Sequence, residues 1–390
     1  MQTNNNIMQG NEQQKIIVVA PAYPYRGGQA LDEAYLYHII SSLGYDYQCI
    51  SYTLLYPKIF FPGKTQYDSS KIIPYPHNER IQRLLSSINP FTWIKTYRYI
   101  KKEKPQMVIF LWWMFFFGPC IGIVSWLIRH YVPSTKVCIL ADNYVSHENH
   151  FWERLIIKKT FSQAQYFIAP SKYIESEIHK DFPTKPICTT TLSVYDCYNL
   201  HRYDQNSART LLGLNTKEVL LFFGLIRPYK GLDKLLEAFS LIKKQRKDIT
   251  LLIVGECYED IKRYTDLINK YHISDSVKLV NKFVENEAIE PYFAACDVVV
   301  LPYYSATQSG VVMTAYAFEK PVVVTNVGGI HEEIDQKRTG VIIDNNSPEN
   351  ILSGVNFVLD NIGKIDYEAN IRIFKDKFGN QTLKEFLKNI

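Results

Sequence analysis

Residues 219–231 read Val-Leu-Leu-Phe-Phe-Gly-Leu-Ile-Arg-Pro-Tyr-Lys-Gly, and this stretch decides the fold class. An apolar run ends at Gly224, a short loop carries Arg227 and Lys230, and an amphipathic stretch starts at Leu232. A continuous apolar run is typical of a strand that is buried on both faces of a parallel sheet. The stretch therefore predicts a strand, a loop and a helix, with two cations at the carboxyl end of the strand.

Short apolar runs alternate with amphipathic stretches along the rest of the chain. The other strand candidates lie at 15–20, 47–52, 107–112, 136–141, 165–170, 250–255, 277–280, 297–302, 321–325 and 340–343. Strand–helix alternation predicts parallel sheets with helices on both faces, an α/β fold. The strand candidates are too many for a single sheet, and a length of 390 residues favours two domains.

We therefore predict two Rossmann-like, doubly wound domains, at residues 1–195 and 196–375, with a cleft between them. Residues 376–390 are expected to form a helix that packs back toward the first domain. Residues 193–216 lack clear periodicity and separate the two groups of strands. Residues 53–90 are rich in Pro, Tyr and Ser, and we expect them to form a long irregular segment of the first domain. Ligands of such folds bind at the carboxyl ends of the strands, so the cleft is the expected binding site.

Composition narrows the class of protein. Seven cysteines include no Cys-x-x-Cys pair, which argues against a disulfide framework or a Cys-rich zinc site and favours a reduced, cytoplasmic protein. Residues 1–195 carry 20 Lys and Arg against 13 Asp and Glu, and they hold all five Trp. Such a basic, aromatic half suits an acidic partner, such as anionic lipid headgroups, nucleic acid or a phosphorylated acceptor, although an ordinary solvated surface explains it equally well.

One segment has the length of a membrane span. Residues 107–128 contain no charge, but Gly118-Pro119 interrupts them, and a buried strand followed by a helix explains the pattern better. Residues 1–14 are polar, and the first apolar run is too short for the core of a signal peptide.

Three further loops follow predicted strands. Gly27-Gly28 precedes a helix, which either lets the backbone approach an anion or simply makes a turn. Residues 307–310, Thr-Gln-Ser-Gly, precede another helix and offer a second anion site. The third loop gathers side chains suited to proton transfer, hydroxyl binding or loop capping: Asp142, Asn143, His147 and Glu148. Arg227 and Lys230 suit a diphosphate, the alternative being two solvated charges.

Four segments resemble glycosyltransferase family 4, the "glycosyl transferases group 1", whose members are retaining enzymes of the GT-B fold. They are FFGLIRPYKGLDKLLEAF from residue 222, YFAACDVVVLPY from 292, TQSGVVMTAYAFEKPVVVTNVGGIHEEI from 307 and DNYVSHE from 142. The resemblance covers residues 215–345 strongly and 15–195 in patches. It implies transfer of a sugar from a nucleotide-diphosphate sugar to an acceptor hydroxyl, with no cofactor besides the donor.

The resemblance also assigns expected roles. Catalysis would fall to Arg227, Lys230, Asp142 and His147, and acceptor binding to Asn143 and Glu148. Donor binding would involve Gly27, Gly28, Gly224, Thr307, Gln308, Ser309, Gly310 and Thr314. No Asp-x-Asp occurs, so the cations are expected to replace a metal. We expect a saccharide or lipid-linked acceptor and no nucleic acid, and a cytoplasmic enzyme that is peripheral at the inner face of the plasma membrane and assembles polysaccharide or lipopolysaccharide.

The sequence departs from the family at three places. Ala306 and Thr314 occupy the two positions of the family's Glu-x7-Glu motif, Leu225 replaces its usual arginine, and Asp142 stands where many members have His. Thr314 offers a single hydroxyl where a glutamate would bind ribose. A non-catalytic nucleotide- or glycan-binding relative is therefore the alternative to an enzyme.

Overall fold

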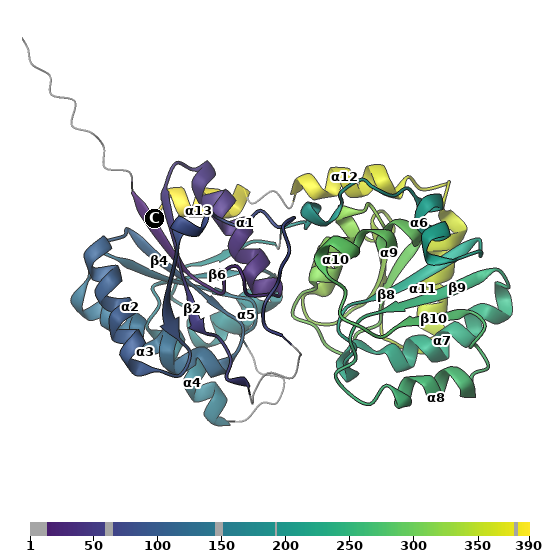
Figure 1. Cartoon of the computed structure of the whole chain (residues 1–390), viewed down its shortest axis with the longest axis horizontal. Coiled ribbons are helices and arrows are strands. Elements are labelled where there is room, and N and C mark those ends of the chain that lie inside the picture. The colour runs from purple at the N-terminus through teal and green to yellow at the C-terminus, as the bar shows by residue number, and fades with distance from the viewer. Residues whose placement is uncertain (1–13, 59–64, 145–150, 192, 378–380) are drawn as a thin grey trace, which may run out of the picture.

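The computed structural model describes residues 14–58, 65–144, 151–191, 193–377 and 381–390. These residues form two domains, each built on a parallel sheet (Figure 1). The first sheet has the order β3-β2-β1-β4-β5-β6-β7, with β1 Lys15–Val19, β2 Asp46–Leu54, β3 Ile81–Ser86, β4 Met107–Trp112, β5 Lys136–Ala141, β6 Tyr166–Ala169 and β7 Ile187–Thr189. The second has the order β10-β9-β8-β11-β12-β13, with β8 Glu218–Phe223, β9 Ile249–Val254, β10 Val277–Val280, β11 Val298–Leu301, β12 Val322–Thr325 and β13 Gly340–Ile343. The predicted fold class is confirmed.

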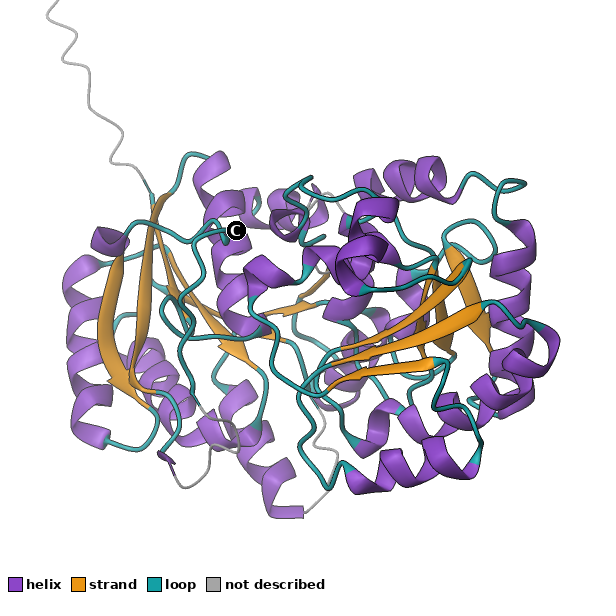
Figure 2. Ribbon diagram, turned by 45° about the vertical axis from the view of Figure 1, so that its right-hand side comes forward, coloured by secondary structure: helices purple, strands orange, loops and turns teal. Residues whose placement is uncertain are grey.

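Helices cover both faces of each sheet (Figure 2). This burial explains the apolar strands: every residue of β4 and of β9 is buried. Successive strand residues point to opposite faces, so Ile17 and Val19 of β1 join one core cluster while Ile16 and Val18 join another.

In the first domain the two faces carry different helices. One core cluster packs α2 Pro90–Glu103, α3 Gly118–Tyr131, α4 Phe151–Ser162 and α5 Lys172–Asp181 against the sheet. On the other face lie α1 Gly28–Ser42 and the last helix of the chain, α13 Gln381–Lys388. Helix α13 inserts Leu383 and Leu387 into this core, and the Tyr45 hydroxyl donates to the Leu387 carbonyl at 3.0 Å. The chain thus returns to the first domain after completing the second.

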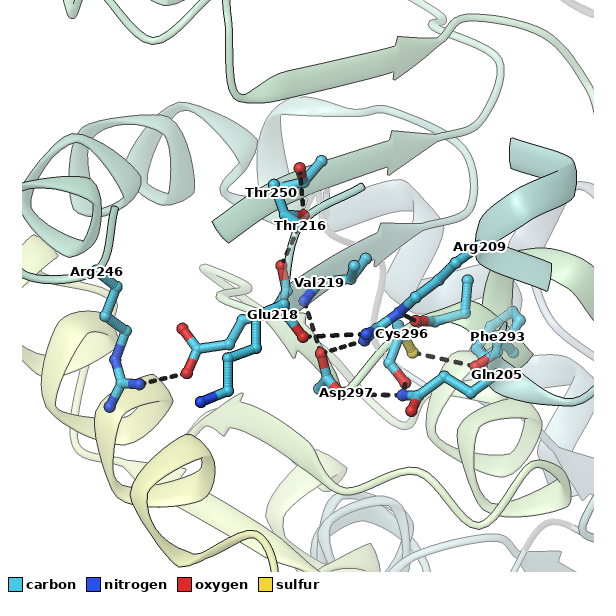
Figure 3. Close-up of polar contacts among 12 residues, drawn as sticks. Gln205, Arg209, Thr216, Glu218, Val219, Arg246, Thr250, Phe293, Cys296 and Asp297 are labelled. Atoms are coloured by element: carbon cyan, nitrogen blue, oxygen red, sulfur yellow. Dashed lines mark hydrogen bonds and ion pairs between the residues drawn. The ribbon is translucent and has the colours of Figure 1, made fainter. Parts of the chain in front are cut away.

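The second domain contains α6 Gln205–Leu212, α7 Leu232–Gln245, α8 Lys262–Lys270, α9 Glu290–Ala295, α10 Gly310–Ala317, α11 Pro348–Asn361 and α12 Tyr367–Lys377. Helix α7 packs against α11, and α6 packs against α9. A polar cluster fixes α6 to the sheet, as Figure 3 shows. Asp297 accepts hydrogen bonds from Arg209 Nη2 at 2.7 Å, Gln205 Nε2 at 2.9 Å and the Val219 amide at 2.7 Å. Helix α6 is therefore part of the second domain although it directly follows the crossing between domains.

The sequence prediction missed three elements. Strand β3 lies within residues 53–90, which were expected to be irregular. It was missed because it is an edge strand, and its polar residues Gln82 and Arg83 interrupt the apolar pattern of a strand. Strand β7, the opposite edge, has only three residues. Helix α6 lies within 193–216, where Asp204 caps it by accepting the Ser207 amide and Gly213 ends it in a left-handed conformation.

Residues 107–128 form β4 and most of α3, as the sequence predicts. No helix in the described part of the chain is both long enough and apolar enough to cross a membrane.

Candidate active site in the interdomain cleft

A cavity of about 410 Å³ lies between the two domains, and we name it the first cavity. Loops at the carboxyl ends of β1, β5, β8 and β11 all contribute to its walls. Parallel strands point their carboxyl ends in one direction, so these loops converge on the cleft. Ten residues predicted from the sequence meet there: Gly27, Gly28, Asp142, Gly224, Lys230, Thr307, Gln308, Ser309, Gly310 and Thr314.

Two further predicted residues, Arg227 and Asn143, do not line the first cavity. Arg227 and Asn143 line a neighbouring cavity of about 1110 Å³, the second cavity, which shares Tyr229 and residues 305–307 with the first. The sequence prediction placed Arg227 and Lys230 at one diphosphate site, whereas the structure places them in two adjoining cavities. His147 and Glu148 fall outside the described residues.

Lys230 is a buried cation that lines the first cavity, which Arg26 also lines. Its side chain belongs to a short 3-10 turn after β8 and is 8% exposed. Gly224 has φ +101°, and a Cβ built there would lie 2.9 Å from Lys230 Nζ, so only glycine lets the ammonium sit against the backbone. Burial, with a smaller contribution from Arg227, lowers the pKa of Lys230 to about 8. An ammonium held in this way is poised to receive an anion.

The start of α10 provides the second feature of this cavity. Ser309 precedes the helix without a side-chain capping hydrogen bond. The Val312 amide donates to the Ser309 carbonyl at 3.0 Å, so the amides of Gly310 and Val311 are the donors that remain available at this end of α10. Gly310 must remain small because a Cβ there would lie 3.0 Å from the Tyr195 ring. The positive end of the helix dipole and free amides favour a negatively charged group. Both Lys230 and the α10 N-terminus thus suit phosphate.

Two buried carboxyl groups line the same cavity. Burial raises the pKa of Asp142 to about 7. Burial, and then the nearby Asp142, raise the pKa of Asp32 well above its ordinary value, while the Tyr195 hydroxyl donates to Asp32 Oδ1 at 3.3 Å. Two neighbouring carboxyl groups with raised pKa values keep their protons to a higher pH than free aspartates, and each can exchange hydrogen bonds with sugar hydroxyls. The sequence analysis missed Asp32, although its position one helical turn after Gly28 places it on the same side of α1.

The ribose-binding role expected for Thr314 is weakened by its surroundings. The Thr314 hydroxyl donates to the Gly310 carbonyl at 2.8 Å, so its proton is used within α10. Another carboxylate, Glu256, lines the cavity from the loop after β9, and its Oε2 has no hydrogen-bond partner among the described residues. Leu225, at the position of the family's arginine, also lines this cavity.

Contacts between the domains flank the cavity. Glu332 accepts the backbone amides of Lys172 at 2.7 Å and Tyr173 at 2.9 Å, at the first turn of α5. On the other side, Asn286 Nδ2 donates to Asp68 Oδ2 at 2.6 Å. Within the described ranges, no three His, Cys, Asp or Glu side chains gather in a way that could hold a metal ion.

Known proteins share this arrangement. The solved structure of Anabaena HepE in complex with UDP-glucose superposes with a TM-score of 0.73 at 16% identity, covering 97% of this chain and 100% of that one. An uncharacterized glycosyltransferase of Methanocaldococcus jannaschii is 23% identical over 64% of this chain and 64% of its own length. The GDP-mannose:glycolipid 4-beta-D-mannosyltransferase of Xanthomonas campestris pv. campestris is 27% identical over 50% of this chain and 52% of its own length.

The matches to these two curated relatives thus span about half to two thirds of their length. The structural likeness shows the two-domain fold of the GT-B glycosyltransferases. Residues 204–372, which include Lys230 and α10, match the family model described as "Glycosyl transferases group 1". The second domain is therefore similar to the glycosyl transferases group 1.

Proposed function

We propose that this protein is a retaining glycosyltransferase that moves a sugar, a hexose in our assignment, from a nucleotide-diphosphate sugar to an acceptor hydroxyl. The observation that carries the proposal is the pairing of Lys230 with the uncapped N-terminus of α10 in one interdomain cavity. Breaking the bond between sugar and diphosphate develops negative charge on the leaving phosphate. Preorganised cations and amides stabilise such charge most effectively where water is excluded. The likeness to HepE, solved with UDP-glucose, supports this donor class.

The rest of the first cavity suits the other parts of a donor. Glu256 offers a carboxylate oxygen that can accept hydroxyl protons, whereas the Thr314 hydroxyl already donates its proton to the Gly310 carbonyl. Asp142 and Asp32 lie on the first-domain wall, where the transferred sugar would be held against its acceptor. In this proposal Asp142 fills the role of the family's histidine as a group that binds and orients hydroxyls.

A second candidate is a binding protein without catalysis. It is favoured by Ala306 and Thr314, which replace both glutamates of the family's motif. Such a protein would bind the nucleotide and release no product.

The discriminating experiment incubates the protein with a panel of UDP-, GDP- and dTDP-sugars in excess EDTA and measures the free nucleotide released. We expect slow hydrolysis of at least one donor, with no requirement for a metal. Replacing Lys230 with Ala should lower the rate about 100-fold, equivalent to about 3 kcal/mol of transition-state stabilisation. Lys262→Ala, an exposed position on α8, is the matched control and should retain full activity.

Release of nucleotide by Lys230→Ala within threefold of the wild type would refute the assignment of Lys230. Donor binding without any release would favour the binding protein. Activity that EDTA abolishes and Mg²⁺ restores would refute metal independence.

For the acceptor, we propose a lipid-linked saccharide at an anionic membrane surface, in the assembly of polysaccharide or lipopolysaccharide. Three helices of the first domain, α2, α3 and α4, expose apolar side chains that include Phe91 at 82% and Phe151 at 77%. Exposed apolar side chains of this size beside basic ones are typical of surfaces that contact membranes. The glycolipid named for the Xanthomonas relative supports this class of acceptor.

A further inference from the structure

The second cavity has an unusual wall. The described residues that line it include the aromatic side chains Trp112, Trp113, Phe115, Tyr144, Tyr173, Tyr229 and Tyr304. Among those described residues Arg227 carries the one charge, and no carboxylate lines the cavity. Arg227 is partly buried, and its buried Nε lacks an acceptor that a ligand of opposite charge could supply.

The contacts of Arg227 leave its hydrogen-bonding groups available. The guanidinium lies over the Tyr258 ring, 5.0 Å from its centre, and this stacking uses its face but not its N–H groups. Within the described part of the chain, Arg227 Nε is buried and has no hydrogen-bond partner, and the same holds for Oδ1 of Asn143 in the same cavity. The cavity therefore presents a donor of charge-assisted hydrogen bonds together with an amide oxygen that can accept a hydroxyl proton.

The position of Arg227 separates it from the donor site. Lys230 lines the first cavity and not the second, whereas Arg227 lines the second and not the first. At the loop position that faces the first cavity stands Leu225, which cannot bind phosphate. The two cations of one loop are thus directed to opposite sides of the wall formed by Tyr229 and residues 305–307.

We propose that the second cavity binds the acceptor, and that the acceptor carries an anionic group held by Arg227 next to an apolar or ring-shaped body held by the aromatic wall. The acceptor hydroxyl would reach the first cavity across the shared wall at residues 305–307. This inference rests on the proposed transferase function, since it names the substrate class of the same cleft. It assigns Arg227 to the acceptor and leaves Lys230 with the donor.

A ring contact links the wall of the second cavity to an exposed aromatic side chain of the first domain. Phe115 lines the cavity, and its ring meets that of Trp152 on α4 edge to face at 5.1 Å between centres. Trp152 is 44% exposed. An acceptor anchored at the α2–α3–α4 surface would therefore meet a continuous aromatic path into the second cavity.

The test uses full-length protein saturated with UDP or GDP, whichever binds, so that the first cavity is filled. Phenyl phosphate, benzoate and phenyl β-glucoside are then titrated by ligand-observed NMR. We expect the wild type to bind at least one of the two anions about tenfold or more tightly than the neutral glucoside, as a charge-assisted hydrogen bond predicts. Preference for phenyl phosphate would identify a phosphorylated acceptor, and preference for benzoate an acidic sugar.

Arg227→Gln should reduce anion binding to the level of the glucoside, while nucleotide affinity stays within about twofold. Arg227→Lys keeps the charge and should retain part of the binding, which controls for a folding defect, and Lys262→Gln should change nothing. Loss of nucleotide affinity in Arg227→Gln, or unchanged anion binding, would overturn the proposal. If neither nucleotide binds the wild type, the proposed donor fails, and the same titration in a Lys230→Gln background still tests the anion site.

Discussion

At the residue scale, Lys230 combines a charge with a position that disfavours that charge. Its ordinary pKa of 10.5 is lowered to about 8, first by burial and then by Arg227. A diphosphate would provide the missing negative charge, so binding is tightest when the side chain is protonated. Below pH 8 the free protein already carries that proton, and above pH 8 binding must take one up from solution.

We therefore predict that nucleotide-diphosphate affinity falls as the pH rises from 7 to 9.5, by about tenfold or more. In Lys230→Arg the guanidinium stays protonated over this range, so its affinity should change by less than about threefold. Calorimetric titration with UDP or GDP at five pH values measures both proteins under the same conditions. Parallel pH profiles would show that another group governs the titration.

Several residues that line the first cavity could be picked out from the sequence, because glycines and cations directly after apolar runs are visible in a linear chain. Gly27, Gly224 and Lys230 all belong to loops whose direction follows from the parallel sheets. The division between Arg227 and Lys230 could not be predicted, since three residues within one irregular loop decide which way each side chain points. Asp32 and Glu256 were missed because single carboxylates in a helix and a loop resemble ordinary surface residues.

At the scale of elements, Glu332 makes one of the contacts that join the two domains beside the cleft. Glu332 belongs to the 3-10 helix Ile330–Glu333 of the second domain, yet its two carboxylate oxygens accept the first amides of α5 in the first domain. Ser171 Oγ also donates to the Thr307 carbonyl across the same gap, at 3.4 Å. A carboxylate at a helix N-terminus is favoured by both hydrogen bonds and the helix dipole.

We predict that Glu332→Gln loosens the closed arrangement, because an amide retains one acceptor and places an N–H group against the other amide of α5. The radius of gyration in small-angle scattering should increase, and kcat/KM should fall about tenfold, equivalent to about 1.4 kcal/mol. Glu349→Gln makes the same chemical change at an exposed position on α11 and serves as the control. Identical scattering and activity for Glu332→Gln and the wild type would show that other contacts suffice to hold the cleft.

The elements themselves were predictable where the pattern was strong. Buried central strands such as β4 and β9 are uniformly apolar and were predicted as strands, although the apolar run that contains β4 also has the length of a membrane span. Edge strands β3 and β7 escaped recognition since an edge tolerates polar and short segments. Glu332 is separated along the chain from its two partners in α5 by 160 and 159 positions, so this contact leaves no local signal in the sequence.

At the scale of the whole molecule, helices α2 and α3 lie on the side of the first domain that faces away from the second domain (Figure 1). Both helices carry exposed apolar side chains. On α2, helical spacing brings one exposed row to the surface: Phe91, Ile94, Lys95, Arg98, Lys101 and Lys102. Ile123 and Trp126 of α3 extend it, and a ring contact between Tyr97 and Tyr131 joins the two helices. This surface suits an anionic bilayer that also accepts inserted aromatic side chains.

We predict that the protein co-sediments with phosphatidylglycerol vesicles at low salt and is released at high salt, because charges are screened within about 10 Å at 0.1 M. Each basic residue near the surface contributes on the order of 1 kcal/mol, so changing Lys95, Arg98 and Lys102 together to Gln should weaken binding about 100-fold or more. The same change at Lys262, Lys337 and Lys364 of the second domain is the control. Equal loss in both triple variants, or no binding at low salt, would leave this surface as ordinary solvated protein.

The return of α13 to the first domain constrains how the cleft can open. The chain crosses between the domains twice. Lys375 lies just before the second crossing and forms an ion pair at 2.6 Å with Asp196, which lies in the first crossing. Topologically, the second domain is an insertion fastened at both ends, with its two attachments side by side. A domain on a single tether can swivel in any direction, but one held at two adjacent points rotates mainly about the line that joins them. Opening and closing should therefore retrace one arc, which returns Lys230 to the same place opposite Asp142 in every cycle.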